Sequence, residues 1–269
     1  MITTMFIDSH VNLHHEQYAE DLEATLARAR GAGICAMLTI CDKLENWPRV
    51  QAIARTNPDI WCSVGVHPHY AKDYSDLSPQ TLIDLAQTES KVIGIGECGL
   101  DRYYEHSPIE AQLPVFRAHI KASRETGLPI IIHTRDADEI MGDVLEEEYA
   151  KGAFPILLHC YTSGAELARR ALALGAYFSM SGIMTFKAAG SVRAVALELP
   201  VDRVIVETDC PYLSPIPYRG RRNEPAYVKE VLAFFAELRD LSFDDAARQT
   251  TENFYRLFQH ADAKVEKCP

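Results

Sequence analysis

The chain has 269 residues, of which 47% are apolar, so it can bury a large core and does not have the composition of a disordered protein. Its formal net charge of −11 argues against a protein that coats nucleic acid through a broad basic face. No uninterrupted apolar stretch reaches the roughly 20 residues that a membrane helix requires, so we expect no membrane partner.

The N-terminus lacks the basic segment and long apolar run of a signal peptide. The seven cysteines form no C-x-x-C pair, and several lie inside apolar, strand-like runs. These features favour a cytoplasmic protein with reduced thiols.

Short β-branched runs alternate with longer helical patterns along the chain, as in the repeated βα units of a parallel sheet. The eight expected strands are Thr4–Ser9, Ile34–Ile40, Ile60–Val66, Val92–Glu97, Pro129–His133, Pro155–His159, Ala176–Met180 and Arg203–Thr208. The helix-like segments include Tyr18–Gly31, Pro108–Gly127, Asp136–Lys151 and Ser163–Gly175, and several end at a glycine that suits a left-handed C-cap. This order predicts a single (β/α)8 TIM barrel over residues 1–260, followed by a short tail at 261–269.

Polar side chains that can bind metals stand at the ends of the expected strands. They are Asp8 and His10 after the first strand, then His67, Glu97, His133, His159 and Asp209. In a parallel barrel all of these ends open onto one face, where the active sites of this fold lie. We therefore expect these residues to converge.

A single histidine after a strand is more often a core or loop residue than a ligand. We keep that interpretation for His14, His15, His106, His119 and His260, which fall in loops or on helices. The apolar runs VIGIG, PIII and PILL, in contrast, lead directly into Glu97, His133 and His159. We therefore expect a metal site made of His10, Glu97, His133, His159 and Asp209.

Imidazole and carboxylate ligands suit one or two divalent metal ions, with Mg, Mn, Zn and Ni as the candidates. Glu97, which has two carboxylate oxygens, is able to bridge two cations. Such cations polarise a phosphoryl or acyl group and acidify water, and Asp209 is placed to act as the general base. The pattern predicts a hydrolase with Asp209 and Glu97 as its catalytic carboxylates.

Five longer motifs resemble those of the TatD family of metal-dependent deoxyribonucleases, in order and in spacing. They are GVHPH (Gly65–His69), GECGLD (Gly96–Asp101), IIHTRDAD (Ile131–Asp138), LHCYTSG (Leu158–Gly164) and ETDCPYLSPIPYRGRRNEP (Glu207–Pro225). The resemblance covers almost the whole chain. It implies an amidohydrolase-like TIM barrel with one or two divalent cations and DNase activity, often of the 3′→5′ exonuclease type.

The resemblance also implies individual roles. His133 and His159 would bind metal, Glu97 would lie near or between the metals, and Asp209 would be a ligand and the base. His67 and Arg135 would lie in the substrate pocket. We expect Arg135 and the basic loop with Arg219 and Arg222 to hold the terminal phosphates of a nucleic-acid end or an oligonucleotide.

The family's first motif is D-x-H-x-H-L, whereas this sequence reads DSHVNL, with Asn12 in the second histidine position. His14 keeps the alternating parity but lies beyond Leu13, where the chain should already be leaving the strand. An amide oxygen is a weaker donor than imidazole for a first-row transition metal. We therefore expect one of two metal positions to lose affinity.

Two other interpretations stay open. One is an amide, ester or lactone hydrolase, for which the basic loop PYRGRRNEP would have little purpose. The other is a metal-poor, non-catalytic barrel, which the substitution at Asn12 suggests. A monomer is compatible with the sequence. Cys98 and Cys160 flank candidate ligands, and the alternation of side chains along a strand predicts that both pack against the helices.

Overall fold

The computed structural model describes residues 4–261, and its eight strands form one parallel sheet in the order β1 to β8. The strands are β1 (Phe6–Val11), β2 (Ile34–Thr39), β3 (Ile60–Val64), β4 (Val92–Asp101), β5 (Ile130–Arg135), β6 (Ile156–Leu158), β7 (Tyr177–Met180) and β8 (Val204–Val206). Each overlaps the strand predicted from the sequence, so the predicted TIM barrel is confirmed. The predicted tail lies outside the described residues, apart from Ala261.

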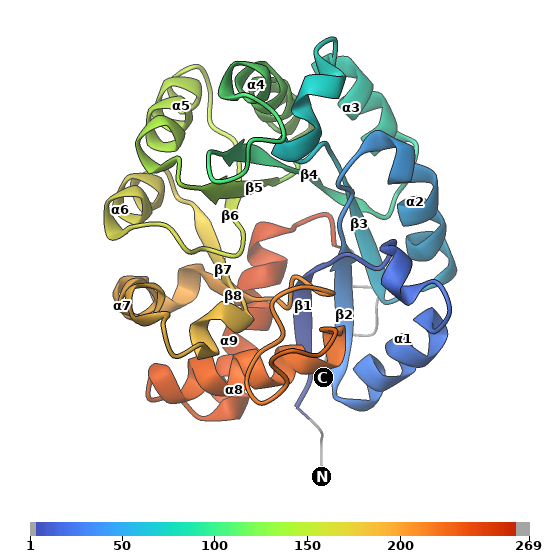
Figure 1. Cartoon of the computed structure of the whole chain (residues 1–269), viewed down its shortest axis with the longest axis vertical. Helices are drawn as coiled ribbons and strands as arrows, with labels where there is room; N and C mark the ends of the chain where they lie inside the picture. The colour runs from blue at the N-terminus through green and yellow to red at the C-terminus, as the bar shows by residue number, and fades with distance from the viewer. Residues whose placement is uncertain (1–3, 262–269) are drawn as a thin grey trace.

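The helices surround the ring of strands, as Figure 1 shows. They are α1 (Leu22–Gly31), α2 (Trp47–Thr56), α3 (Pro79–Gln87), α4 (Ile109–Thr126), α5 (Asp138–Ala150), α6 (Ala165–Ala173), α7 (Gly190–Glu198), α8 (Val228–Leu238) and α9 (Phe243–Leu257). None of the helices in the described part of the chain has the length and hydropathy of a membrane-spanning segment.

The interior of the barrel is filled at the end where the strands begin. Side chains near the strand starts, such as Ile7, Ile93 and Ile131, form one apolar cluster with Phe254 and Phe258 from the α9 region. Because α9 covers this end, the polar chemistry is restricted to the opposite end of the barrel, where the strands finish.

The barrel closes between its first and last strands. Val11 and Cys210 form a parallel bridge. The buried carboxylate of Asp8 accepts hydrogen bonds from the backbone N–H of Thr208 at 2.9 Å and from its hydroxyl at 2.6 Å. Asp8 therefore joins the two ends of the sheet, and the expectation that it faces the site with His10 is wrong.

Strand β4 continues past Glu97 to Asp101, further than predicted, and its register against β5 shifts between Gly96 and Cys98. This bulge gives β4 an extra residue, Glu97, whose side chain faces the barrel interior. Cys98 packs in the apolar core with residues of α4, as predicted. Gly99 has φ of +137°, and a Cβ atom there would lie 2.0 Å from the carbonyl oxygen of His133.

Five of the described cysteines, Cys41, Cys62, Cys98, Cys160 and Cys210, have free thiols, as predicted. Cys35 differs from the prediction because it is disulfide-bonded.

Candidate metal centre

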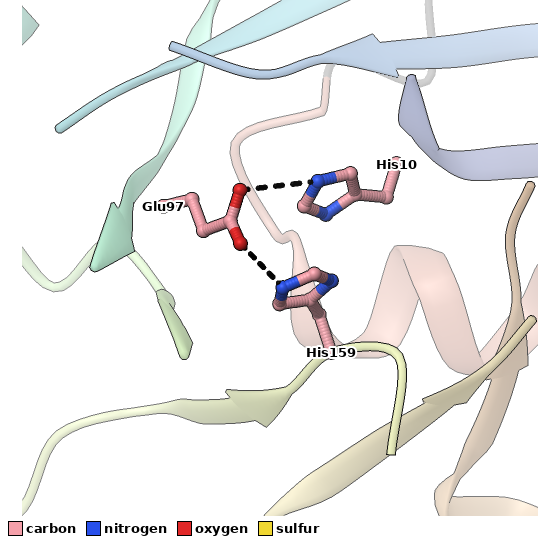
Figure 2. Close-up of side chains that lie close together, drawn as sticks. All are labelled: His10, Glu97 and His159. Atoms are coloured by element: carbon pink, nitrogen blue, oxygen red, sulfur yellow. Dashed lines mark hydrogen bonds and ion pairs between the residues drawn. The ribbon is translucent and has the colours of Figure 1, made fainter. Parts of the chain in front are cut away.

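Four imidazoles converge on the carboxylate of Glu97 at the end of the barrel where the strands finish. Oε1 of Glu97 lies 2.7 Å from Nε2 of His159, 3.4 Å from Nδ1 of His133 and 3.5 Å from Nε2 of His67. Oε2 of Glu97 lies 3.5 Å from Nε2 of His10. Figure 2 shows the Glu97 carboxylate between the rings of His10 and His159.

Asp209 completes this group from the segment after β8. Its Oδ1 lies 3.6 Å from Nε2 of His10 and accepts a hydrogen bond from the side-chain amide of Asn12 at 3.2 Å. The structure therefore brings together all five residues that the sequence suggested as metal ligands. It also places Asn12 directly against the Asp209 carboxylate.

The environment of His10 fits a bound cation. The residue is fully buried, yet neither ring nitrogen has a hydrogen-bond partner within residues 4–261. An unpaired polar atom in the interior is costly, so it indicates a missing partner. Single ligand atoms of His10, Glu97 and His159 lie within 4.8 Å of one another, and two imidazoles with a carboxylate suit a divalent transition metal.

A second trio, His67, Glu97 and His133, is equally compact. Nδ1 of His67, however, accepts the backbone N–H of His69 at 3.1 Å. Burial lowers the pKa of His67 to about 3, so its ring is neutral and the proton stays on Nε2. This nitrogen is a hydrogen-bond donor, which suits a contact to an anionic substrate better than a metal bond.

Two carboxylates contact the second ring nitrogen of His133 and of His159, on the side away from Glu97. Oδ2 of Asp101 lies 2.9 Å from Nε2 of His133, and Oε1 of Glu207 lies 3.4 Å from Nδ1 of His159. Such contacts fix the orientation and tautomer of a ligating imidazole, leaving the other nitrogen directed at Glu97. Our sequence interpretation missed Asp101 and Glu207 as supports, although both lie in the quoted motifs.

The electrostatics of the centre keep Glu97 ionised. Burial alone would raise the pKa of Glu97, but the imidazole of His159 and the hydrogen bonds from the surrounding histidines outweigh it and hold this pKa well below its usual value. Burial would lower the pKa of His159, yet the carboxylates of Glu97 and Glu207 raise it well above its usual value. For Asp209, burial dominates and raises the pKa to about 6. A concentration of charge of this kind in a buried cluster is typical of a functional site.

A cavity of about 760 Å³ opens above these residues. Its walls include His67 and Arg135, the two residues expected in the substrate pocket. His14, His15 and His106 lie in loops, as expected, and also line it. His119 has the structural role expected, because its Nε2 accepts the backbone N–H of Val66 at 2.9 Å.

Arg219 and Arg222 do not line this cavity. The guanidinium of Arg222 donates to Asp21 at 2.8 and 2.7 Å and so ties the segment after β8 to the start of α1. The Arg219 guanidinium lies 3.8 Å from the centre of the Phe186 ring. The contact of these two arginines with phosphates therefore stays a prediction that the cavity itself does not support.

Further cavity residues were not identified from the sequence. His69, Tyr104 and Tyr212 all line the cavity. His69 could have been found, because it stands two residues after His67 in the GVHPH motif. Cys160 lines the cavity too, so the prediction that it packs against the helices is wrong; its φ of +43° breaks the alternation expected of a strand.

A family model described as TatD related DNase matches residues 7–259. The uncharacterized metal-dependent hydrolase YabD of Bacillus subtilis is 40% identical over 255 residues, which cover 95% of this chain and 99% of that protein. The 3′-5′ ssDNA/RNA exonuclease TatD of Erwinia tasmaniensis is 34% identical over 257 residues, covering 93% and 98%.

The crystal structure of YjjV, a TatD homologue from Escherichia coli, has a TM-score of 0.88 to this chain at 28% identity, covering 96% of this chain and 99% of that one. The family model, the two relatives and the crystal structure each match this chain over nearly its whole length. The chain belongs to the TatD family and is a metal-dependent hydrolase.

Proposed function

We propose that this chain hydrolyses phosphodiester bonds at the 3′ ends of nucleic acids, as a 3′→5′ deoxyribonuclease. The observation that supports this most directly is that His133, His159, Glu97 and Asp209 line one cavity that also contains Arg135, with His10 buried against Glu97. A relative that is 34% identical carries the name of a single-strand exonuclease. The net charge of −11 fits binding at an end rather than along a duplex.

In this proposal His10, Glu97, His133, His159 and Asp209 hold one or two divalent cations. A cation bound there would supply Lewis-acid polarisation of the phosphoryl group and would acidify water. The share of imidazole in the donor set favours Mn, Zn or Ni over Mg.

The chain's own residues provide the remaining steps. Asp209 accepts the proton of the attacking water, since its carboxylate faces the cavity beside His10. The Nε2–H of His67 donates to a phosphoryl oxygen. The guanidinium of Arg135 neutralises phosphate charge, and it has no carboxylate or carbonyl partner within the described residues that would compete for its N–H groups.

End-labelled oligonucleotides test the proposal. Metal-stripped protein is reloaded separately with Mg²⁺, Mn²⁺, Zn²⁺ or Ni²⁺ and mixed with a 5′-labelled and a 3′-labelled single strand. We expect the 5′-labelled strand to shorten step by step, and the 3′ label to be released first as a mononucleotide. Failure to cut either strand with every metal would contradict the proposal.

The variants Glu97→Gln and Asp209→Asn provide the matched controls. Both remove a charge while keeping the shape of the side chain, and both should lose at least a hundredfold in rate. Circular dichroism and thermal unfolding show whether each variant keeps the fold. A nuclease activity that survives in Glu97→Gln would point to a contaminating enzyme.

One observation favours a second candidate, an amide, ester or lactone hydrolase. The basic loop that separated the two functions in the sequence does not line the cavity, because Arg222 is paired with Asp21. A panel of chromogenic esters and lactones, assayed beside the oligonucleotides, discriminates between the two. Turnover of a neutral substrate together with no cleavage of DNA would favour this alternative.

A further inference from the structure

Three exposed tyrosines lie at or beside the mouth of the central cavity. Six large apolar or aromatic side chains in the described part of the chain are exposed, and three of them are Tyr103, Tyr104 and Tyr212, at 55%, 42% and 51%. Tyr104 and Tyr212 line the cavity itself. Aromatic surface left in water beside a catalytic cavity indicates a binding surface.

The tyrosines approach the cavity from opposite sides. Tyr103 and Tyr104 follow β4, whereas Tyr212 follows β8. In a closed ring of eight strands, the fourth and the eighth lie across from each other, as Figure 1 shows. A nucleic-acid strand that enters the cavity between these loops would meet a tyrosine from each of them.

On the β4 side, the tyrosines pack against each other and against neighbouring side chains. Tyr103 and Tyr104 pack edge to face at 4.8 Å, and the ring of Tyr104 stacks on His106 at 5.4 Å. The Arg135 guanidinium lies 3.7 Å from the centre of the Tyr103 ring and 5.0 Å from that of Tyr104. A cation therefore lies directly beside the two aromatic rings.

This surface is tied to the metal centre by one carboxylate. Oδ1 of Asp101 accepts the backbone N–H groups of Tyr103 and Tyr104, each at 2.9 Å, while Oδ2 contacts His133. Tyr212 is tied just as closely, since its N–H donates to the carbonyl oxygen of Asp209 at 3.1 Å. The backbone of both tyrosines is thus bonded directly to residues of the metal centre.

We propose that Tyr104 and Tyr212 are stacking subsites for the unpaired bases on either side of the scissile phosphate, with Arg135 contacting the phosphate beside Tyr104. The inference rests on the proposed function and adds to it the side chains that would hold the bases. Stacking is tolerant of sequence because every base has a π face. In a duplex the terminal base is held by its partner and the base before it is stacked on both faces, so the subsites favour single strands over duplex ends.

Binding of a short phosphorothioate single strand to the metal-loaded protein tests the subsites. Fluorescence anisotropy should show the Kd raised about fivefold to a hundredfold in Tyr104→Leu and in Tyr212→Leu. Tyr104→Phe and Tyr212→Phe keep the ring and should stay within about twofold of the wild type. Leu197→Ala, a change at an exposed residue of α7, is the surface control.

A second strand, abasic at its two 3′-terminal positions, separates stacking from general packing. The wild type and the Phe variants should bind it more weakly than the intact strand. Each single Leu variant should show a smaller difference because one subsite remains, and the double variant Tyr104→Leu with Tyr212→Leu should bind the two strands equally. If Leu and Phe changes act alike, or if the wild type binds both strands equally, the stacking subsites are wrong. A wild type that cleaves single strands while the Leu variants bind normally overturns only this inference; a wild type that neither binds nor cleaves overturns the proposed function as well.

Discussion

Asp101 holds His133 at its outer nitrogen, with 2.9 Å between Oδ2 of Asp101 and Nε2 of His133. Burial would raise the pKa of Asp101, but the hydrogen bonds from His133 and His69 hold it well below its usual value. An ionised Asp101 therefore keeps the proton of His133 on Nε2 and leaves Nδ1 free to face Glu97.

Asp101→Asn should weaken metal binding about tenfold to a hundredfold, because an amide no longer fixes the tautomer of His133. Competition with a metal-binding dye measures the affinity directly and does not depend on catalysis. Asp136→Asn is the matched control, since Asp136 is exposed, has φ of +51°, which Asn also adopts, and contacts no histidine of the centre among the described residues. Equal affinities in the wild type and Asp101→Asn would contradict the assigned role.

Asn12→His should raise the metal content from about one towards two ions per chain. The amide of Asn12 faces Asp209, 3.2 Å from its Oδ1, so an imidazole at this position would add a nitrogen donor beside that carboxylate. Elemental analysis after dialysis against buffered metal gives the ratio. Asn12→Gln, which changes the side chain without adding imidazole, should stay at the wild-type value. A wild type that already holds two ions would show that Asn12 does not limit occupancy.

The barrel and the convergence of Glu97, His133 and His159 were predictable because they follow from local patterns. An apolar run that leads into a metal-binding side chain is visible in the sequence, and the parallel fold brings such ends to one face. The bulge at Glu97 was not predictable in the same way, since it depends on the register between β4 and β5.

Pairings between distant residues were also beyond the sequence. The sequence interpretation assigned Arg222 to phosphate, yet its guanidinium is bound to Asp21, which lies 201 positions away. The rule that neighbouring strand residues face opposite sides worked for Cys98 but not for Cys160, whose left-handed backbone turns its side chain to the cavity. Tyr104 and Tyr212 belong to loops, where no simple periodicity says which side chain faces a cavity.

Gly99→Ala should destabilise the barrel severely, by more than about 4 kcal/mol, or prevent folding. An added Cβ would lie 2.0 Å from the carbonyl oxygen of His133, and the φ of +137° is itself unfavourable for alanine. Gly127→Ala is the matched control, because Gly127 also has a positive φ, +74°, but no atom lies within 4 Å of the new Cβ. It should cost about 1–2 kcal/mol.

Urea unfolding of the wild type and the two glycine variants measures the loss in free energy of unfolding that each substitution causes. A Gly99→Ala protein as stable as Gly127→Ala would mean that β4 and β5 are not packed as closely as the structure shows.

His119 should make the protein less stable as the pH falls from about 6.5 to about 4. Burial lowers the pKa of His119 to about 4, whereas the unfolded chain titrates near 6.5, so the unfolded state binds more protons throughout this range. The stabilisation is complete above pH 6.5 and is lost towards pH 4. Linkage gives a decrease of roughly 2–3 kcal/mol in the free energy of unfolding between about pH 7.5 and about pH 4.5.

His119→Gln isolates this contribution, since glutamine does not titrate and its oxygen is able to accept the backbone N–H of Val66 that now bonds to Nε2. Both proteins are unfolded with urea in the presence of a chelator, so that metal release does not add to the pH dependence. Between about pH 7.5 and about pH 4.5, the free energy of unfolding of the wild type should fall by roughly 2–3 kcal/mol relative to that of His119→Gln. Parallel curves for the two proteins would contradict this prediction, because they would mean that His119 binds its proton equally well in the folded and in the unfolded protein.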